Sequence, residues 1–140
     1  MAKSVVVDTG PIVASLVAGD ALHGWTRECF SRLRPPLLTC EPVLSEAAFI
    51  LKRLGGDPSA ALALVEKQVL RVAFSLQDQA GQLRALMDRY AQVPMSLADA
   101  CLVRMSELID DSVVMTMDSD FRIYRKNGRK VIPLITPDDI

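Results

Sequence analysis

The 140-residue sequence has little of several residue types on which common enzyme chemistries depend. It contains one histidine, His23, which excludes a metal site built on a histidine pair and leaves a Ser-His-Asp triad only through that residue. No serine stands in a nucleophile elbow, and no glycine-rich phosphate loop occurs. The three cysteines are an odd, unclustered set, so neither a disulfide framework nor a zinc site is indicated.

Long hydrophobic runs are also missing. The longest apolar stretches, such as residues 60–65, fall far short of the roughly 20 residues of a membrane-spanning helix. The three valines before Asp8 are too few for the core of a signal peptide. Because half of the residues are hydrophobic and 24% are charged, the chain does not have the composition of a disordered protein. We expect a single globular domain over residues 1–140, cytoplasmic and without membrane association.

Short apolar segments alternate with longer segments that have helical patterns. Strands are expected at residues 4–7, 37–39, 69–74, 113–116 and 131–133. Helices are expected at about residues 9–19, 23–33, 41–54, 57–68, 76–90 and 96–109, with Thr9 able to cap the first. This alternation is typical of an α/β fold with a parallel sheet. Ligands of such sheets gather outside the carboxyl ends of the strands.

Several carboxylates follow the carboxyl ends of the expected strands, where ligands of parallel sheets bind. Asp8 directly follows the first expected strand, and Asp118 and Asp120 follow the fourth. Glu46 and Asp99 are unusual in another way, because each lies among apolar residues on its expected helix face. Their carboxylates are therefore expected to point inward, which is costly unless something compensates the charge.

Each acid also fits an ordinary role when it is taken alone. Asp8 fits a turn, and Asp99 fits the first turn of a helix, where the helix dipole favours an acid. Glu46 fits an exposed position or an ion pair, and Asp118 and Asp120 fit a turn or a cap. Four carboxylates about 6 Å apart would repel by about 2.8 kcal/mol per pair and by roughly 17 kcal/mol together. A converging cluster must therefore hold protons or bind a cation, and oxygen ligands favour Mg²⁺ or Mn²⁺.

The acids belong to four short motifs along the chain. In order, these are Val6-Val7-Asp8-Thr9, Ser45-Glu46, Leu97-Ala98-Asp99-Ala100 and Thr116-Met117-Asp118-Ser119-Asp120-Phe121. The set resembles the PIN-domain nucleases, and among them most closely the VapC-type toxins of prokaryotic toxin–antitoxin pairs. The resemblance spans nearly the whole chain. It implies a Rossmann-like α/β/α sandwich with a central, mostly parallel sheet, and metal-dependent endonucleolytic cleavage of RNA.

The same resemblance implies roles for individual residues. Asp8 and Asp99 match direct ligands of a Mg²⁺ or Mn²⁺ ion, and Glu46 and Asp118 complete an acidic quartet of catalytic and metal-binding residues. Asp120 matches an additional acid that some members use. The supporting hydroxyls are those of Thr9 and Thr116. Met115 and Met117, beside these acids, are expected to be packing residues, and the sequence leaves one or two metal ions open.

Expected partners are an RNA substrate, an antitoxin protein and a second copy of the chain. Basic residues after the last motif are candidate phosphate contacts, namely Arg122, Arg125, Lys126, Arg129 and Lys130. Trp25 and Phe30 contribute to an apolar content larger than a compact monomer needs to bury. Alternatives are an RNA-processing nuclease without toxicity, a catalytically silent binding module and, less well supported, a receiver-type phosphoacceptor domain.

The overall charge is nearly balanced, with 16 Lys+Arg against 17 Asp+Glu. This balance excludes a strongly basic nucleic-acid binder. If the five candidate site acids are set aside, 16 basic residues face 12 acidic ones. A negative metal pocket within a mildly basic body is therefore compatible with a nuclease.

Overall fold

Five strands form one central sheet in the computed structural model, which describes residues 3–137. Their order is β3–β2–β1–β4–β7, and every pairing between neighbours is parallel. The strands are β1 (Ser4–Val7), β2 (Leu37–Thr39), β3 (Leu70–Val72), β4 (Ser112–Met115) and β7 (Leu134–Ile135). The prediction of a mostly parallel α/β sheet is confirmed.

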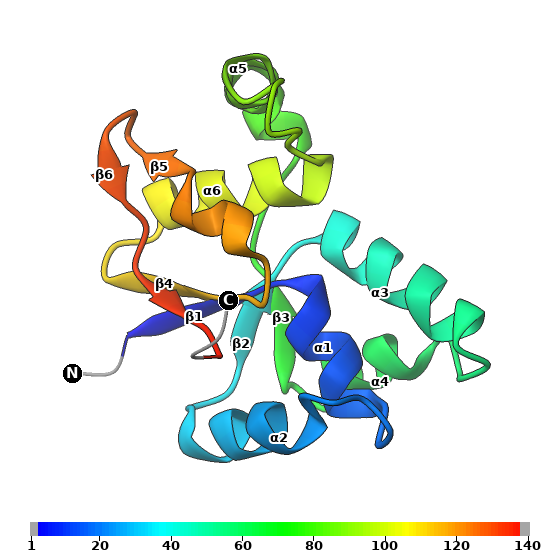
Figure 1. The fold of residues 1–140 in the computed structure, drawn as a ribbon. Helices are drawn as coiled ribbons and strands as arrows, with labels where there is room; N and C mark the ends of the chain where they lie inside the picture. Colours follow the sequence, from blue (N-terminus) through cyan, green and yellow to red (C-terminus); the bar gives the residue numbers. More distant parts are fainter. Residues whose placement is uncertain (1–2, 138–140) are drawn as a thin grey trace.

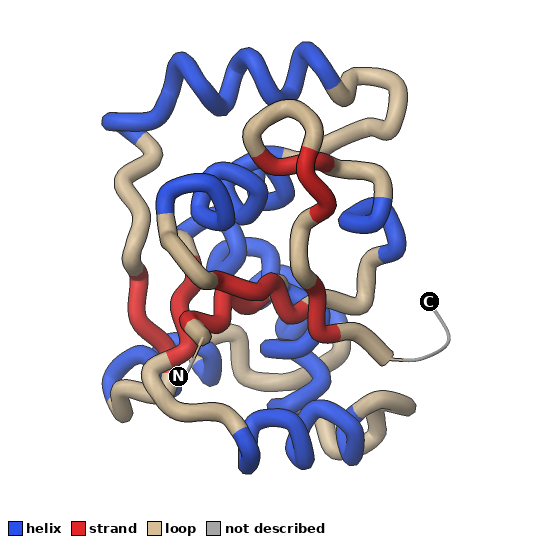
Figure 2. Tube along the Cα trace, turned by 90° about the vertical axis from the view of Figure 1, so that its left-hand side faces the viewer, coloured by secondary structure: helices blue, strands red, loops and turns tan. Residues whose placement is uncertain are grey.

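Helices cover both faces of this sheet. They are α1 (Thr9–Leu16), α2 (His23–Arg32), α3 (Glu41–Arg53), α4 (Ala60–Glu66), α5 (Ala80–Arg89) and α6 (Leu97–Leu108), with short 3₁₀ helices η1 (Gln77–Gln79) and η2 (Ser119–Arg122). Figures 1 and 2 show α5 and α6 above the layer of strands and α1 and α2 below it. None of the helices within residues 3–137 has the length and hydropathy needed to cross a membrane.

The two central strands carry the core. In β1 and β4, Val6 pairs with Val114 and Val7 pairs with Met115, and all four residues have no exposed surface. Because both faces of a parallel sheet are covered by helices, its strands consist of unbroken apolar runs. β-branched valine suits these positions, since it packs well on a pleated, buried surface.

The strand order creates a crevice beside β1. The chain passes from β1 to β2 and β3 on one side, and then returns to place β4 on the other side of β1. The order therefore reverses between β1 and β4, and such a switch point opens a crevice at the carboxyl ends of the strands. Asp8 follows β1 and Asp118 follows β4, so both acids lie at this crevice.

The end of the chain differs from the sequence prediction. The strand expected at 131–133 is wrong, because Lys130–Val131 (β6) pairs antiparallel with Arg125–Lys126 (β5) in a separate two-stranded sheet. Asn127 and Gly128 between them both have positive φ, as a type I′ hairpin turn requires. The main sheet gains its fifth strand only after Pro133, which has no N–H to donate.

Other boundaries are shorter than predicted. α1 ends at Leu16 rather than near residue 19, α4 occupies only part of 57–68, and β3 occupies only part of 69–74. The segment 76–90 is divided into η1 and α5. None of these changes alters the order of the elements, so the predicted topology holds up to β4.

Candidate active site

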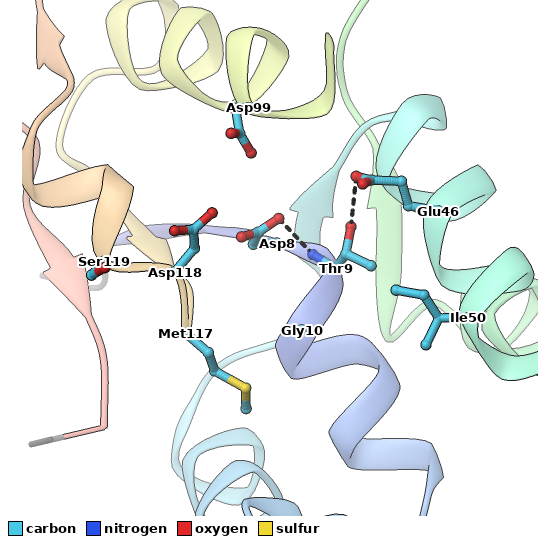
Figure 3. A pocket seen from close by; sticks show the side chains of 9 residues that line it. All are labelled: Asp8, Thr9, Gly10, Glu46, Ile50, Asp99, Met117, Asp118 and Ser119. Atoms are coloured by element: carbon cyan, nitrogen blue, oxygen red, sulfur yellow. Dashed lines mark hydrogen bonds between the residues drawn. The ribbon is translucent and has the colours of Figure 1, made fainter. Parts of the chain in front are cut away.

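A pocket of about 480 Å³ opens at the carboxyl ends of β1 and β4. Its lining residues are Asp8, Thr9, Gly10, Glu46, Ile50, Asp99, Met117, Asp118 and Ser119. Four of them are carboxylates, and each comes from a different segment of the chain. Figure 3 shows these four side chains around one common space. The structure thus brings together the acidic quartet that the sequence singles out, although up to 110 residues separate its members.

Asp8 is the buried acid of the pocket, with 7% of its surface exposed. Its Oδ1 accepts a hydrogen bond from the backbone N–H of Thr9 at 2.7 Å, and its Oδ2 accepts one from the Thr116 hydroxyl at 2.7 Å. Asp8 is therefore the N-cap of α1, and the expectation that Thr9 caps this helix is wrong. One carboxylate oxygen of Asp8 caps the N-terminus of α1, and the other accepts the hydrogen bond from Thr116 at the end of β4.

Thr116 links the two strand ends. Its hydroxyl donates to Asp8 and accepts a hydrogen bond from the backbone N–H of Asp118 at 3.0 Å. The Thr116 side chain is fully buried, and its hydrogen bond to Asp8 lies away from solvent. One threonine therefore orients the carboxylate after β1 and the backbone that carries the carboxylate after β4.

Glu46 is placed by α3 at the outer edge of the pocket. Its Oε2 accepts a hydrogen bond from the Thr9 hydroxyl at 3.2 Å. The prediction that Glu46 points into the apolar interior is wrong, because the residue is exposed at the pocket mouth. The buried face of α3 is formed instead by Val43, Leu44, Ala47 and Leu51.

Asp99 approaches from the opposite side, in the first turn of α6. Ser96 caps this helix: its hydroxyl accepts from the Asp99 N–H at 3.0 Å, while the Ser96 N–H donates back to Asp99 Oδ2 at 3.5 Å. Ser96 and Asp99 therefore form a capping box at the start of α6. Oδ2 also accepts a hydrogen bond from the Tyr124 hydroxyl at 2.9 Å.

The two acids after β4 are not equivalent. Asp118 lines the pocket and caps η2, since its Oδ1 accepts from the Asp120 N–H at 2.9 Å. Asp120 is half-buried and is not among the residues that line the pocket. The geometry therefore separates Asp120 from the quartet.

Burial and mutual repulsion make the carboxylates reluctant to ionise. Burial raises the pKa of Asp8 from 3.8 to about 6, against the lowering effect of Thr116 and Thr9, and the charges of Asp99 and Asp118 raise it further. Burial also raises the pKa of Glu46 and of Asp99, and Asp118 adds to both shifts.

No basic side chain neutralises these charges within residues 3–137. The ion pairs there join Arg32 with Glu28 and Arg104 with Glu107, away from the pocket. Buried carboxylates without a cationic partner are costly, so the pocket has the charge of a cation-binding site. In their present positions no three acidic, cysteine or histidine side chains of this part of the chain are placed to hold one ion together.

The basic residues after β4 lie outside the pocket. The Arg125 guanidinium donates to the backbone carbonyls of Arg122, Ile123 and Tyr124 at 2.7–3.1 Å, so it stabilises the turn after η2. Arg122 donates to Thr136 at 3.2 Å. Arg129 and Lys130 are exposed on the β5–β6 hairpin, and Lys126 is half-buried there.

Three features of the site escape the sequence prediction. Tyr124 is buried and bonded to Asp99, 25 residues away, and no local pattern connects the two. Gly10 lies so near Met117 that an added Cβ would be 3.3 Å from its Sδ. Met115 is a core residue as expected, whereas Met117 packs on Gly10 and lines the pocket.

Comparison with known proteins decides the family. A family model described as "PIN domain" matches residues 5–127. The chain belongs to the PIN domain family. The crystal structure of Mycobacterium tuberculosis VapC20, described as a sarcin–ricin loop cleaving toxin, matches with a TM-score of 0.75 and 28% sequence identity. The match covers 93% of this chain and 100% of VapC20. A search of curated proteins found no significant match.

These matches confirm the resemblance to VapC-type PIN proteins that the four motifs indicate. They also confirm the fold, because the structural match covers 93% of this chain, whose parallel sheet is flanked by helices, and 100% of VapC20. The pocket is thus the crevice of a PIN domain.

Proposed function

We propose that this protein is a metal-dependent endoribonuclease that acts as the toxin of a VapBC-type toxin–antitoxin pair. The observation that carries the proposal is the pocket itself, where Asp8, Glu46, Asp99 and Asp118 meet and no basic side chain from the described residues 3–137 neutralises them. The match to VapC20, which is described as a sarcin–ricin loop cleaving toxin, supports the substrate class.

The donor set fits Mg²⁺ or Mn²⁺. Asp8 and Asp99 are the ligands we propose, and Glu46 and Asp118 line the same pocket and complete the set of oxygen donors. When bound, such an ion neutralises the attacked phosphate and lowers the pKa of a coordinated water. A hard cation would also stabilise the ionised form of Asp8, whose pKa is raised in the chain alone.

The protein's own residues prepare this site. Thr116 and the N-terminus of α1 hold Asp8 in one orientation, and the hydroxyl of Thr9 holds Glu46 at the mouth of the pocket. Glu46 is solvent-accessible, which suits a carboxylate that accepts a proton from water or releases one to it. Asp120 lies outside the pocket, so we assign it no direct catalytic contact.

Two substitutions test the proposal. Asp8→Asn and Asp99→Asn are each expected to reduce RNA cleavage in Mg²⁺ or Mn²⁺ at least 100-fold, because each removes a charged oxygen ligand. Asp88→Asn is the matched control, since Asp88 is exposed on α5 and does not line the pocket. A sarcin–ricin loop RNA and an unrelated hairpin of equal length serve as substrates. Unchanged cleavage by both pocket variants would overturn the assignment of the metal site.

The toxin role requires a separate test. Expression of the wild-type chain is expected to stop bacterial growth, and expression of Asp8→Asn is expected to leave growth unaffected. Cleavage in vitro combined with normal growth would favour an RNA-processing role instead.

We further propose a cytoplasmic location, a homodimer and an antitoxin as protein partner. Trp25 and Phe30 are partly buried against the core. Large exposed apolar side chains on α3, just after it and on α4 are Phe49, Leu54 and Leu62, at 62%, 59% and 56% exposure. Sedimentation of the wild type and Leu62→Glu would test the dimer, which the charge is expected to weaken.

A further inference from the structure

Tyr124 is a buried tyrosine whose hydroxyl group reaches the pocket acids. The side chain has no exposed surface, and its hydroxyl donates to Asp99 Oδ2 at 2.9 Å. It lies beyond η2, in the segment that follows Asp118, whereas Asp99 belongs to α6. The contact therefore joins two of the segments that carry the quartet.

Two aromatic rings hold Tyr124 in place. The rings of Tyr90 and Phe121 each pack edge-to-face against it, both with centroids 5.1 Å away, at 69° and 85°. The Tyr90 hydroxyl is not part of this ring contact, and it accepts a hydrogen bond from the Arg125 N–H at 2.9 Å. A ring packed on two sides has little rotational freedom, so the direction of the Tyr124 hydroxyl is set by the core.

The hydrogen bonds to Asp99 are all on one side of the carboxylate. Tyr124 and the more distant Ser96 N–H both donate to Oδ2. Within residues 3–137, no donor is bonded to Oδ1. One oxygen is thus used for orientation, and the other is left for a ligand in the pocket that Asp99 lines.

We propose that Tyr124 is a positioning residue, which holds Asp99 through Oδ2 so that Oδ1 faces the divalent cation. The inference rests on the proposed function, since it concerns the ion assigned to that pocket. Groups that orient metal ligands in this way commonly contribute 10- to 100-fold to metal affinity or activity.

Tyr124→Phe and Tyr90→Phe form a matched pair for the test. Each removes one hydroxyl that makes a 2.9 Å hydrogen bond, and both leave the same aromatic cluster filled. Only the Tyr124 hydroxyl contacts a pocket acid. Mn²⁺ binding is measured by electron paramagnetic resonance of the free aqueous ion, the melting temperature is measured in EDTA, and RNA cleavage is measured over a range of Mn²⁺ concentrations.

Tyr124→Phe is expected to weaken Mn²⁺ binding about tenfold or more, and saturating Mn²⁺ is expected to restore most of the cleavage rate. Tyr90→Phe is expected to bind Mn²⁺ as the wild type does, with a comparable change in melting temperature. Equal Mn²⁺ affinity in the wild type and Tyr124→Phe would overturn the positioning role alone. Equal weakening by both variants would also overturn it, because the effect would then be structural. A wild type that neither binds Mn²⁺ nor cleaves RNA would overturn the proposed function as well.

Discussion

At the scale of single residues, the pKa of Asp8 makes folding stability depend on pH. The folded chain holds a proton on Asp8 up to about pH 6, whereas an ordinary aspartate loses it near 3.8. Without metal, the free energy of unfolding therefore falls as the pH rises through this window, by on the order of 3 kcal/mol from this group. The raised pKa values of Glu46 and Asp99 act in the same direction.

Asp8→Asn is expected to remove most of this pH dependence. It should raise the stability of the metal-free protein at pH 7.5 by about 1–3 kcal/mol while it abolishes cleavage, since a neutral side chain replaces a buried charge. Urea unfolding in EDTA at pH 4, 6 and 7.5 measures the effect, with Asp88→Asn as control. A variant that keeps the wild-type slope between pH 4 and 6 would show that Asp8 does not titrate in this range.

The role of the Thr116 hydroxyl in the site can be distinguished from the structural role of an ordinary buried threonine. Thr116→Val removes the hydroxyl that orients Asp8, and we expect cleavage to fall about tenfold. Thr39→Val is the control, because Thr39 is equally buried at the end of β2, but its hydroxyl donates to the Val7 carbonyl. Each variant should lose about 1 kcal/mol of stability by urea unfolding. A similar loss of activity in both would mean that Thr116 acts only through the fold.

Site residues could be predicted from the sequence where a single local pattern identified them. Asp8 was predicted because it directly follows a buried strand, and Asp118 because it comes shortly after another. The burial of Glu46 was predicted wrongly, because neighbours on a helix face do not reveal where that face stops touching the core. Tyr124 was missed, since its partner lies on another element.

At the scale of elements, the start of α6 connects helix stability with the site. Ser96→Ala removes the cap of this helix and is expected to cost about 1 kcal/mol by urea unfolding. It should also weaken cleavage by only a few-fold, because Tyr124 still holds Asp99. Ser59→Ala is the control: Ser59 precedes α4 but makes no capping hydrogen bond. A loss of stability no greater than that of Ser59→Ala would contradict the capping role.

Elements with a clear hydrophobic pattern or a clear start signal were predicted well, and elements without such a pattern were not. β1, β2, α3 and α6 begin within a residue of their expected positions. The β5–β6 hairpin was missed although Asn127-Gly128 is a typical hairpin turn, because its two-residue strands are too short to show an alternating pattern.

At the scale of the whole molecule, metal binding should stabilise the fold. An ion that binds only the native state at 100 times its dissociation constant contributes about 2.7 kcal/mol, which corresponds to roughly 10 °C in melting temperature. We expect this rise in Mn²⁺ for the wild type and not for Asp8→Asn, as measured by differential scanning calorimetry. A rise of equal size in Asp8→Asn would indicate that the ion binds elsewhere.

The sequence by itself determined the fold class and the order of elements up to β4, which depend on hydrophobic periodicity, helix caps and strand ends, all of them local along the chain. The resemblance of its four motifs to PIN-domain nucleases indicated which acids form the quartet. Only the tertiary structure decided that Asp120 lies outside the pocket, that Arg125 supports a turn and that Tyr124 holds Asp99. Such outcomes depend on the distance and direction between side chains far apart in sequence, which packing sets and periodicity does not.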